Sequence, residues 1–419
     1  MPLAYKIWLL TSLYLAQGLP YGFFTQALPV LLREQGFSLT AISATTLLFA
    51  PWALKFAWAP LLDHTGSRRR WLLALQLGAV AGAAALGLVV DLGAALWLLL
   101  LSLFAFNLVS ATQDIVTDGL AVNLLSARER GLGNGIQVGG YRLGMILGGG
   151  LLLWVFAQSG WQLMFLGMAV LLAMTALPVF VLREPAPASP ASPPPRALVL
   201  GWWPRLRQPG IPAFIGLICL YKFGDSMGAS LVGPFMHDSG LSKAQIALIK
   251  GTFGSAATLA GAAAGGWMAW RLGRRSALLS CGLLQAASLV LYAMAALGDS
   301  GPPLIAAACI AEHLLGGMAV VALFTLMMDA SDPQHAGTDY TLLSCALVLI
   351  HGAAAFTGAL LADAAGYGAL FVVSVVVATA GCLVLVGAID RGAGPARLRE
   401  VWTRRITSEL HAPAPAPGA

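Results

Sequence analysis

Charged side chains are scarce in this chain of 419 residues, since Asp, Glu, Lys and Arg together make up only 10% of it. A soluble domain usually carries about 25% charged residues, so the composition excludes an ordinary water-soluble protein. The hydrophobic class reaches 58% instead. Apolar stretches of about 20 residues recur along the chain, and each is long enough to cross the hydrocarbon of a bilayer. The sequence therefore predicts a polytopic helical membrane protein.

Motifs of familiar catalytic and nucleotide-binding sites are also missing. The chain has no HExxH, no GxSxG, no aspartate-rich diphosphate motif and no GxxxxGK[ST] loop. We therefore expect no enzyme, and we expect the energy for any transport to come from a gradient or a partner protein. The five cysteines lie within apolar stretches without CxxC spacing, which predicts small buried side chains and no metal site, cofactor or disulfide framework.

The net charge of +6 invites a nucleic-acid interpretation, but the placement of the charge argues against it. The basic residues form short clusters between apolar segments and make no stripe on an amphipathic face. Nucleic acid is therefore not an expected partner. The expected partners are the lipid bilayer, a small-molecule substrate and protons, and we expect the chain to be a monomer.

Turn and charge punctuation divides the apolar sequence into twelve predicted spans. They are expected at 6–32, 40–62, 71–90, 95–124, 132–157, 161–182, 211–236, 244–270, 276–297, 302–328, 339–362 and 367–390. A proline- and serine-rich stretch separates the sixth span from the seventh and is expected to be a semi-extended linker. The predicted domains are an N-terminal six-helix bundle, a linker, a C-terminal six-helix bundle and a basic tail, at 1–182, 183–208, 209–390 and 391–419.

The distribution of Lys and Arg predicts the orientation. An even number of spans puts both termini on one side, and that side holds eighteen of the 24 Lys and Arg, whereas the opposite side holds only Arg33 and Lys243. Cytoplasmic loops carry the excess of positive charge in membrane proteins. We therefore expect both termini and the linker to be cytoplasmic.

An internal repeat supports the division into two halves. Residues Gln35–Ile42 match Ser239–Ile246 at an offset of 204, and Gly66–Arg69 match Leu272–Arg275 at a similar offset. This layout is typical of a major facilitator transporter: an all-α protein of twelve transmembrane helices in two pseudo-symmetric six-helix halves, with its site near the midplane between them. The loop Asp63–Arg70 resembles the superfamily signature between spans 2 and 3, except that His64 replaces a common Arg or Lys. The resemblance implies a gating latch at Asp63, Gly66, Arg68, Arg69 and Arg70.

Several ionisable residues lie inside the predicted spans, where each costs about 2.5–3.5 kcal/mol and normally faces a partner or a watery cavity. They include Lys55, Asp114, Asp118, Arg142, Lys222, Asp225 and Glu312. They could pair internally as structural contacts, Lys222 with Asp225 and Arg142 with an aspartate of span 4. They could also line a central cavity in which the cations bind an anionic substrate and an acid carries a proton.

Two of these residues leave alternatives open. Lys55 lies near the cytoplasmic end of its span and could be functional or merely reach toward the interface. Glu312 has only His313 as a cationic neighbour in its own span, which favours it as the proton carrier over Asp225, one turn from Lys222. As neighbours in a helix, Glu312 and His313 are expected to point to different faces.

Several motifs together resemble AmpG-type muropeptide permeases and the related acetyl-CoA transporters. They are Gln17–Pro20, Pro51–Pro60 with Asp63, Gln113–Asp118, Gly140–Arg142 and Tyr221–Asp225. The resemblance covers nearly the whole chain and adds Gln17, Gln113 and Tyr141 to the candidate pathway. It implies proton-driven uptake of a bulky polar solute across the bacterial inner membrane by alternating access.

Within this branch, muropeptide permeases are usually longer, with two extra spans, whereas this chain has room for twelve. Its Gly337–Thr341 segment looks more like the short siderophore permeases (the rhizobactin and pyochelin importers), because a Thr-Gln pair tends to stand there in muropeptide permeases. We therefore expect proton-coupled import of an iron–siderophore complex. Import of a muropeptide-like or other bulky anionic solute is the alternative. An exporter of the same fold is another, since direction is not written in the fold.

Overall fold

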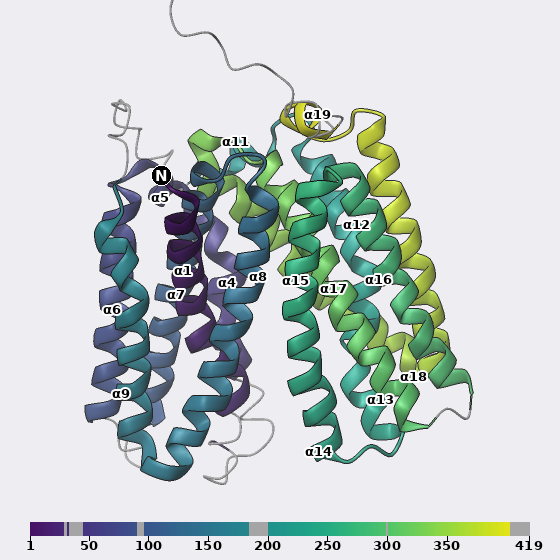
Figure 1. Ribbon diagram of the computed structural model, residues 1–419, viewed down its shortest axis with the longest axis horizontal. Coiled ribbons are helices and arrows are strands. Elements are labelled where there is room, and N and C mark those ends of the chain that lie inside the picture. Colours follow the sequence, from purple (N-terminus) through teal and green to yellow (C-terminus); the bar gives the residue numbers. More distant parts are fainter. Residues whose placement is uncertain (29–31, 33–44, 90–95, 184–199, 299–300, 403–419) are drawn as a thin grey trace, which may run out of the picture. The chain divides into compact units, whose positions relative to one another are not determined.

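The computed structural model describes residues 1–28, 32, 45–89, 96–183, 200–298 and 301–402, and this part of the chain is built of helices without a strand (Figure 1). Arg33, the repeated loop Gln35–Ile42, most of the predicted linker and the end of the tail lie outside the described residues. The described helices follow the predicted spans closely.

The helices of the first half occupy most of the sequence up to Val181. They are α1 (Leu3–Gly22), η1 (Phe23–Ala27), η2 (Thr45–Phe49), α4 (Ala50–Leu54), η3 (Lys55–Ala57), α5 (Ala59–His64), α6 (Arg68–Val89), α7 (Leu96–Leu124), α8 (Arg130–Ile146), η4 (Leu147–Leu151) and α9 (Leu152–Val181). Two of these, η1 and η4, are short π-helical turns, whereas η2 and η3 are 3₁₀ helices.

The linker ends in a short helix, and the second half then repeats the pattern. The elements are α11 (Trp202–Leu206), α12 (Ile211–Ala229), α13 (Val232–Asp238), α14 (Lys243–Ile246), η5 (Ala247–Phe253), α15 (Gly254–Arg271), α16 (Arg274–Leu297), α17 (Pro302–Ala330), the 3₁₀ helix η6 (Pro333–His335), α18 (Ala336–Asp390) and α19 (Ala396–Trp402).

Twelve spans are recovered when the helical stretches are divided at their breaks. Seven stretches of the described chain are long and apolar enough to cross a membrane. Two of them are helix pairs, joined at Gly160 (φ 76°) and Gly366 (φ 80°), where only glycine accepts the positive φ without strain. These seven therefore comprise nine spans. The other three are α1 with η1, the broken stretch from η2 to α5, and α14 with η5 and α15.

The internal repeat is also visible in the helix boundaries. The starts of α6 and α16 and of α8 and α18 differ by 206 in residue number, as do the ends of α7 and α17 and the two glycine breaks Gly160 and Gly366. The pseudo-symmetry predicted from two short loops is confirmed over most of the chain.

The chain forms two compact units, each of which takes in a segment from the other half of the sequence. Unit 1 comprises Met1–Leu124, Ile136–Arg207 and Ser331–Leu349, and unit 2 comprises Leu125–Gly135, Gln208–Ala330 and Ile350–Ala419. The aromatic core of unit 1 includes Phe23 against Phe165, with ring centroids 5.1 Å apart. That of unit 2 stacks Tyr292 on Phe371 at 5.1 Å. The domain boundaries given above stay predictions.

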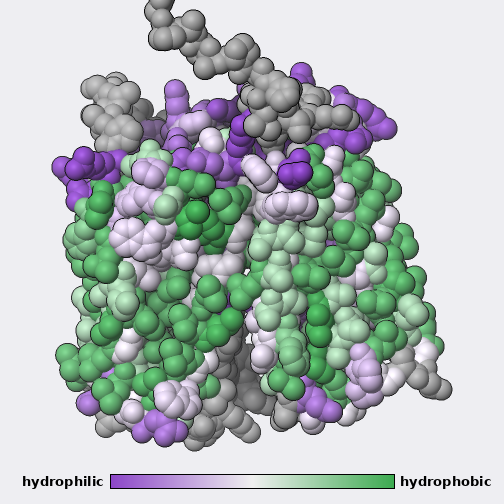
Figure 2. Space-filling model, viewed as in Figure 1, coloured by the Kyte–Doolittle hydropathy of each residue, from purple (hydrophilic) through white to green (hydrophobic). Residues whose placement is uncertain are grey.

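Apolar side chains also cover the outside of the helices. Figure 2 shows hydrophobic residues over the long helices and hydrophilic ones gathered toward the helix ends. Large exposed apolar residues include Trp154, Phe180 and Phe356. A soluble protein does not expose so much apolar surface, so these side chains face lipid.

Glycines bring α1 and α8 into backbone contact within unit 1. A methyl group at Gly144 would collide with the Leu15 carbonyl and lie 2.8 Å from the Cα of Gly18, and a methyl group at Gly18 would collide with the Tyr141 carbonyl. Small residues allow helices to approach closely where lipid supplies no hydrophobic driving force between them. This crossing fixes Gln17 and Tyr141, one residue from Gly18 and three from Gly144, next to each other's helices.

We predict that Gly144→Ala lowers the stability of the protein in detergent by about 1–3 kcal/mol, because the added methyl group has no space. The measurement is the unfolding temperature of the purified variant, followed by size-exclusion chromatography of heated samples. Gly78→Ala in α6 is the control, since a methyl group there meets nothing within 4 Å. Equal stability of the two variants would contradict the close crossing of α1 and α8.

Candidate functional site

The second span is broken where it carries its lysine. Pro51 lies in the first turn of α4 and Pro60 in the first turn of α5, and the 3₁₀ helix η3 lies between these two helices. Proline supplies no N–H to the preceding turn, so the backbone cannot run through as one α-helix. Lys55 begins η3, at the break, and is only 3% exposed.

Two tryptophans attach this broken span to α7 on either side of Lys55. The indole N–H of Trp52 donates to the side-chain oxygen of Asn107 at 3.1 Å, and the indole N–H of Trp58 donates to the hydroxyl of Thr112 at 3.2 Å. These two hydrogen bonds thus hold Lys55 against α7 at a fixed position along that helix. This explains how a residue in an irregular segment reaches a partner on a neighbouring helix.

That partner is Asp114, with which Lys55 forms a buried ion pair. The ammonium group also lies 5.4 Å from the centre of the Trp52 ring. Of the two alternatives for Lys55, interfacial anchoring is wrong, because the side chain is buried and paired. Asp114 and Asp118 are four residues apart and share one face of α7, as their spacing predicts.

Asp118 is bound by neutral groups. The hydroxyl of Tyr14 donates to its Oδ1 at 3.0 Å, and the Nε2 of Gln137 donates to the same oxygen at 3.2 Å. The hydroxyl of Tyr340 in turn donates to Oε1 of Gln137 at 3.3 Å. Asp118, Tyr14 and Tyr340 are each 1% exposed. The carboxylate of Asp118 therefore joins α7 to α1 and α8, and the amide of Gln137 extends the cluster to α18.

Other predicted pathway residues of unit 1 lie on α1, α7 and α8. The amide of Gln17 is buried, and neither of its atoms hydrogen-bonds to any residue that the structure describes; the same holds for Nε2 of Gln113. Tyr141 makes a ring contact with Tyr21 at 5.5 Å, and Arg142 follows Tyr141 in α8. These groups offer donors, acceptors and an aromatic face to a polar ligand.

Unit 2 contains the other predicted charges. Lys222 and Asp225 form the ion pair expected from their spacing. The expectation that Glu312 and His313 point to different faces is wrong: the Nδ1 of His313 lies 2.7 Å from Oε2 of Glu312 and 2.9 Å from the carbonyl oxygen of Cys309. The Cβ atoms of adjacent helix positions point in different directions, but rotation about the side-chain bonds brings the carboxylate and the imidazole ring together. Within the described ranges no three His, Cys, Asp or Glu residues are placed to hold a metal ion.

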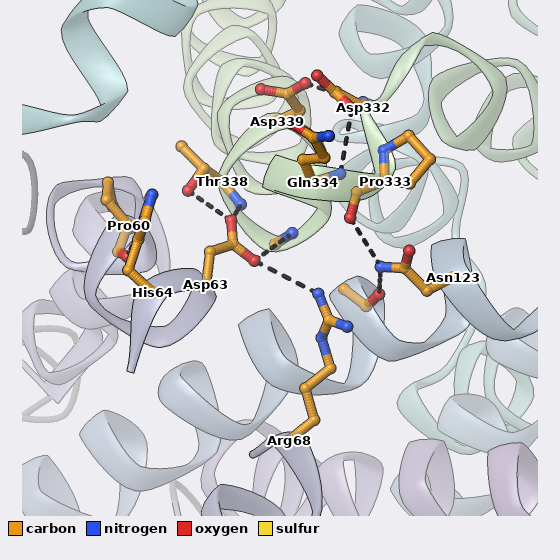
Figure 3. A network of polar contacts seen from close by, with 12 residues as sticks. Pro60, Asp63, His64, Arg68, Asn123, Asp332, Pro333, Gln334, Thr338 and Asp339 are labelled. Atoms are coloured by element: carbon orange, nitrogen blue, oxygen red, sulfur yellow. Dashed lines mark hydrogen bonds and ion pairs between the residues drawn. The ribbon is translucent and has the colours of Figure 1, made fainter. Parts of the chain in front are cut away.

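The predicted latch loop centres on Asp63 (Figure 3). Its carboxylate accepts hydrogen bonds from the backbone N–H of Gly337 at 3.0 Å, and from the N–H and the hydroxyl of Thr338, both at 2.7 Å. Arg68 lies 3.7 Å from the same carboxylate. Because α18 begins at Ala336, Asp63 caps the first turn of a helix that belongs to the other half of the sequence.

The remaining loop residues support this arrangement. Gly66 adopts φ 68° and so makes the turn between α5 and α6. Arg69 donates to the carbonyl of Phe180 at 2.9 Å, which ties the loop to the end of α9, whereas Arg70 is exposed. His64, the departure from the superfamily signature, contacts the ring of His335 at a centroid distance of 5.4 Å.

Two further ionic contacts at the helix ends were not predicted from the sequence. In unit 1, Arg205 of α11 binds both oxygens of Asp339, at 2.7 and 2.6 Å. Burial opposes the charge of Arg205, but these hydrogen bonds raise its pKa above the usual value. In unit 2, Arg274 and Arg130 both bind the fully buried Asp329. Arg274 stands 206 positions after Arg68, so the repeat itself contained a signal for this second network.

Comparisons with known proteins place the chain among transporters. A family model described as Major Facilitator Superfamily matches residues 10–342 and 213–413. The anhydromuropeptide permease of Escherichia coli K12 is 32% identical over 393 residues, covering 90% of this chain and 78% of the permease.

Solved structures show the same fold at low identity. The human organic anion transporter MFSD10 superposes with a TM-score of 0.73 at 15% identity, covering 92% of this chain and all of that one. The proton:xylose symporter XylE superposes with a TM-score of 0.71 at 12% identity, covering 95% of this chain and 99% of that one.

We predict that Lys55→Met lowers the stability of the protein by about 3–5 kcal/mol, because Asp114 is left as an unpaired buried charge. The measurement is thermal unfolding in detergent. The double variant Lys55→Met/Asp114→Asn should recover most of the loss, since both charges are then absent. Lys250→Met, at a half-buried lysine of η5, is the control with a small effect. A double variant as unstable as the single one would contradict the ion pair.

Proposed function

The chain belongs to the Major Facilitator Superfamily and is a membrane-spanning secondary transporter, and on this premise we propose that it imports anhydromuropeptide-like solutes with protons. The import would run across the inner membrane of a bacterium, with both termini of the chain in the cytoplasm. The transporter would act as a monomer by alternating access. The observation that carries the proposal is the 32% identity to an anhydromuropeptide permease over 90% of this chain.

The chemistry of unit 1 suits such a solute. A muropeptide joins sugar to peptide, so it brings hydroxyl, amide and carboxylate groups. Gln17 and Gln113 have buried amide groups for the polar atoms, Arg142 carries the charge for a carboxylate, and Tyr141 presents a ring to a sugar face. Lys222 in unit 2 is already paired with Asp225, so we assign it a smaller part in binding.

The buried carboxylates support proton coupling. Asp114 has a fixed cation in Lys55, whereas the hydrogen bonds to Asp118 come from the neutral groups of Tyr14 and Gln137. A neighbouring cation favours the ionised form of a carboxylate, and burial without one disfavours it. Asp118 is therefore the better proton carrier of the two. Glu312, with His313 in contact, is the corresponding candidate in unit 2.

Import of an iron–siderophore complex stays a prediction that these findings do not specifically support. It was favoured by the Gly337–Thr341 segment, but this segment is engaged inside the protein. Gly337 and Thr338 bind Asp63, Asp339 binds Arg205, and Tyr340 binds Gln137. Residues with these partners do not need a ligand to explain them.

The proposal is tested by uptake of a radiolabelled anhydromuropeptide into cells that lack their own permease for it. We predict accumulation only when this chain is expressed, and loss of accumulation with a protonophore. Asp118→Asn should reduce proton-driven uptake at least tenfold at normal expression, because the carrier can no longer exchange its proton. Asp363→Asn, at an exposed acid of α18, is the matched control and should leave uptake unchanged.

The same cells also decide between the alternatives. They are given radiolabelled iron as a panel of siderophore complexes under iron starvation. Uptake of iron without uptake of anhydromuropeptide would replace the proposed solute with a siderophore. Faster loss of preloaded solute from expressing cells would replace import with export.

A further inference from the structure

The four-residue segment Gly337–Tyr340 makes two kinds of contact at once. Its first two residues bind the carboxylate of Asp63 in the latch loop, at 3.0 and 2.7 Å for the backbone N–H groups. Its last residue, Tyr340, belongs to the buried cluster around Asp118 and donates to Gln137. Less than one helical turn of α18 therefore lies between the latch and the buried carboxylates.

The path from Tyr340 to the buried acid is continuous. Tyr340 donates to Oε1 of Gln137 at 3.3 Å, and Nε2 of the same amide donates to Oδ1 of Asp118 at 3.2 Å. An amide has one acceptor end and one donor end, so its orientation depends on both neighbours. Asp118 holds the donor end, and this presents the acceptor end to Tyr340.

The groups that face Asp118 come from five elements, and they set the charge of the cluster. Lys55 of η3 and Asp114 of α7 are the charged ones, and Tyr14 of α1, Gln137 of α8 and Tyr340 of α18 are neutral. With both carboxylates ionised, one positive charge faces two negative ones. Binding of a single proton makes the cluster neutral.

We propose that Gln137 and Tyr340 are a relay that couples protonation of Asp118 to release of the Gly337–Tyr340 segment from Asp63. The relay deepens the proposed proton-coupled function and rests on it. Gln137 and Tyr340 are positioning residues here, since neither carries the proton. The proton itself binds to the Asp118 carboxylate and leaves from it to water after the segment has moved.

Each step of the relay has a physical cause. A hydrogen bond to an ionised carboxylate is about twice as strong as a bond between neutral groups, so protonation weakens the hold of Asp118 on the Gln137 amide. The amide can then turn, and Tyr340 loses an acceptor of fixed orientation. Asp63 retains its bonds to Gly337 and Thr338, and Arg205 retains Asp339, but the Tyr340 end of the segment loses its attachment to α8. The first turn of α18 thus separates from Asp63 more readily when Asp118 is protonated.

The test measures the distance between α18 and the latch loop as a function of pH, without any substrate. Spin labels are attached to Arg70→Cys and Gln334→Cys, two exposed positions beside Asp63 and Thr338. Cys219, the only half-exposed cysteine among the five, is first replaced by serine, and the other four are buried. Distances are recorded by pulsed electron paramagnetic resonance on the full chain in lipid nanodiscs, from about pH 8 to about pH 5.

Molecules with a long distance between the two labels are called separated, and those with a short distance docked. In the parent protein we expect the ratio of separated to docked molecules to rise on acidification. Tyr340→Phe removes one neutral hydrogen bond, so the ratio at high pH should rise about fivefold, and the response to pH should disappear. Tyr14→Phe is the matched control. It removes a tyrosine hydroxyl that belongs to α1 and donates directly to Oδ1 of Asp118, the oxygen that also accepts from Gln137. The midpoint should therefore shift, and the response should remain. Asp118→Asn should give the separated distances at every pH.

Two results would overturn the relay: a parent protein whose distances do not change with pH, or a Tyr340→Phe variant that keeps the parent's full response. A variant that unfolds is recognised by its chromatographic profile, and Asp118→Asn then decides, since docked labels at every pH in that variant would also overturn the relay. This test of the relay is independent of the identity of the transported solute. A pH-dependent distance without anhydromuropeptide uptake contradicts the solute and leaves the relay standing.

Discussion

The structure depends on a helix end that is capped by a residue from a different segment. The first N–H groups of any α-helix have no partner within the helix, and in α18 the carboxylate of Asp63 supplies it. The contact needs a glycine, because a methyl group at Gly337 would lie 2.7 Å from the Asp63 oxygen. A helix capped in this way is stable only while the two segments stay together. The latch is thus a consequence of the unpaired backbone N–H groups at the start of a helix.

The same requirement for satisfied groups shapes the charged cluster deeper in unit 1. Each isolated charge would be costly in an apolar bundle, so Lys55 and Asp114 compensate each other, and Asp118 is held by hydroxyl and amide donors. The broken second span makes this possible, because prolines open the helix where Lys55 must turn toward α7. Irregular backbone at membrane depth is tolerated where neighbouring side chains restore the lost hydrogen bonds. Trp52 and Trp58 hold that segment against α7 through side-chain hydrogen bonds to Asn107 and Thr112.

Much of the fold could be predicted from the sequence because hydropathy and turn residues act locally. Span boundaries such as 276–297 and 302–328 agree with α16 and α17 to within two residues, and the pair Lys222–Asp225 follows from helical spacing alone. Long-range partners could not be predicted. Lys55 and Asp114 are 59 residues apart, and Arg130 and Asp329 are 199 apart, and no local pattern says which helices will meet. The contact between Glu312 and His313 was missed for another reason, since helical spacing describes Cβ directions and not side-chain rotation.

The choice of proton carrier shows how contacts revise a ranking based on spacing. The sequence favoured Glu312 because no strong cation stands near it in its own span, and it treated Asp114 and Asp118 alike. In the folded chain Lys55 distinguishes these two aspartates, because it forms its ion pair with Asp114. Asp114 is already paired with Lys55, whereas among the described residues Asp118 accepts hydrogen bonds only from the neutral groups of Tyr14 and Gln137. Asp118 is also the acid in contact with an amide that reaches α18. In the proposed mechanism a single carboxylate therefore meets both requirements of coupled transport: it binds the proton, and it is connected through Gln137 to the first turn of α18.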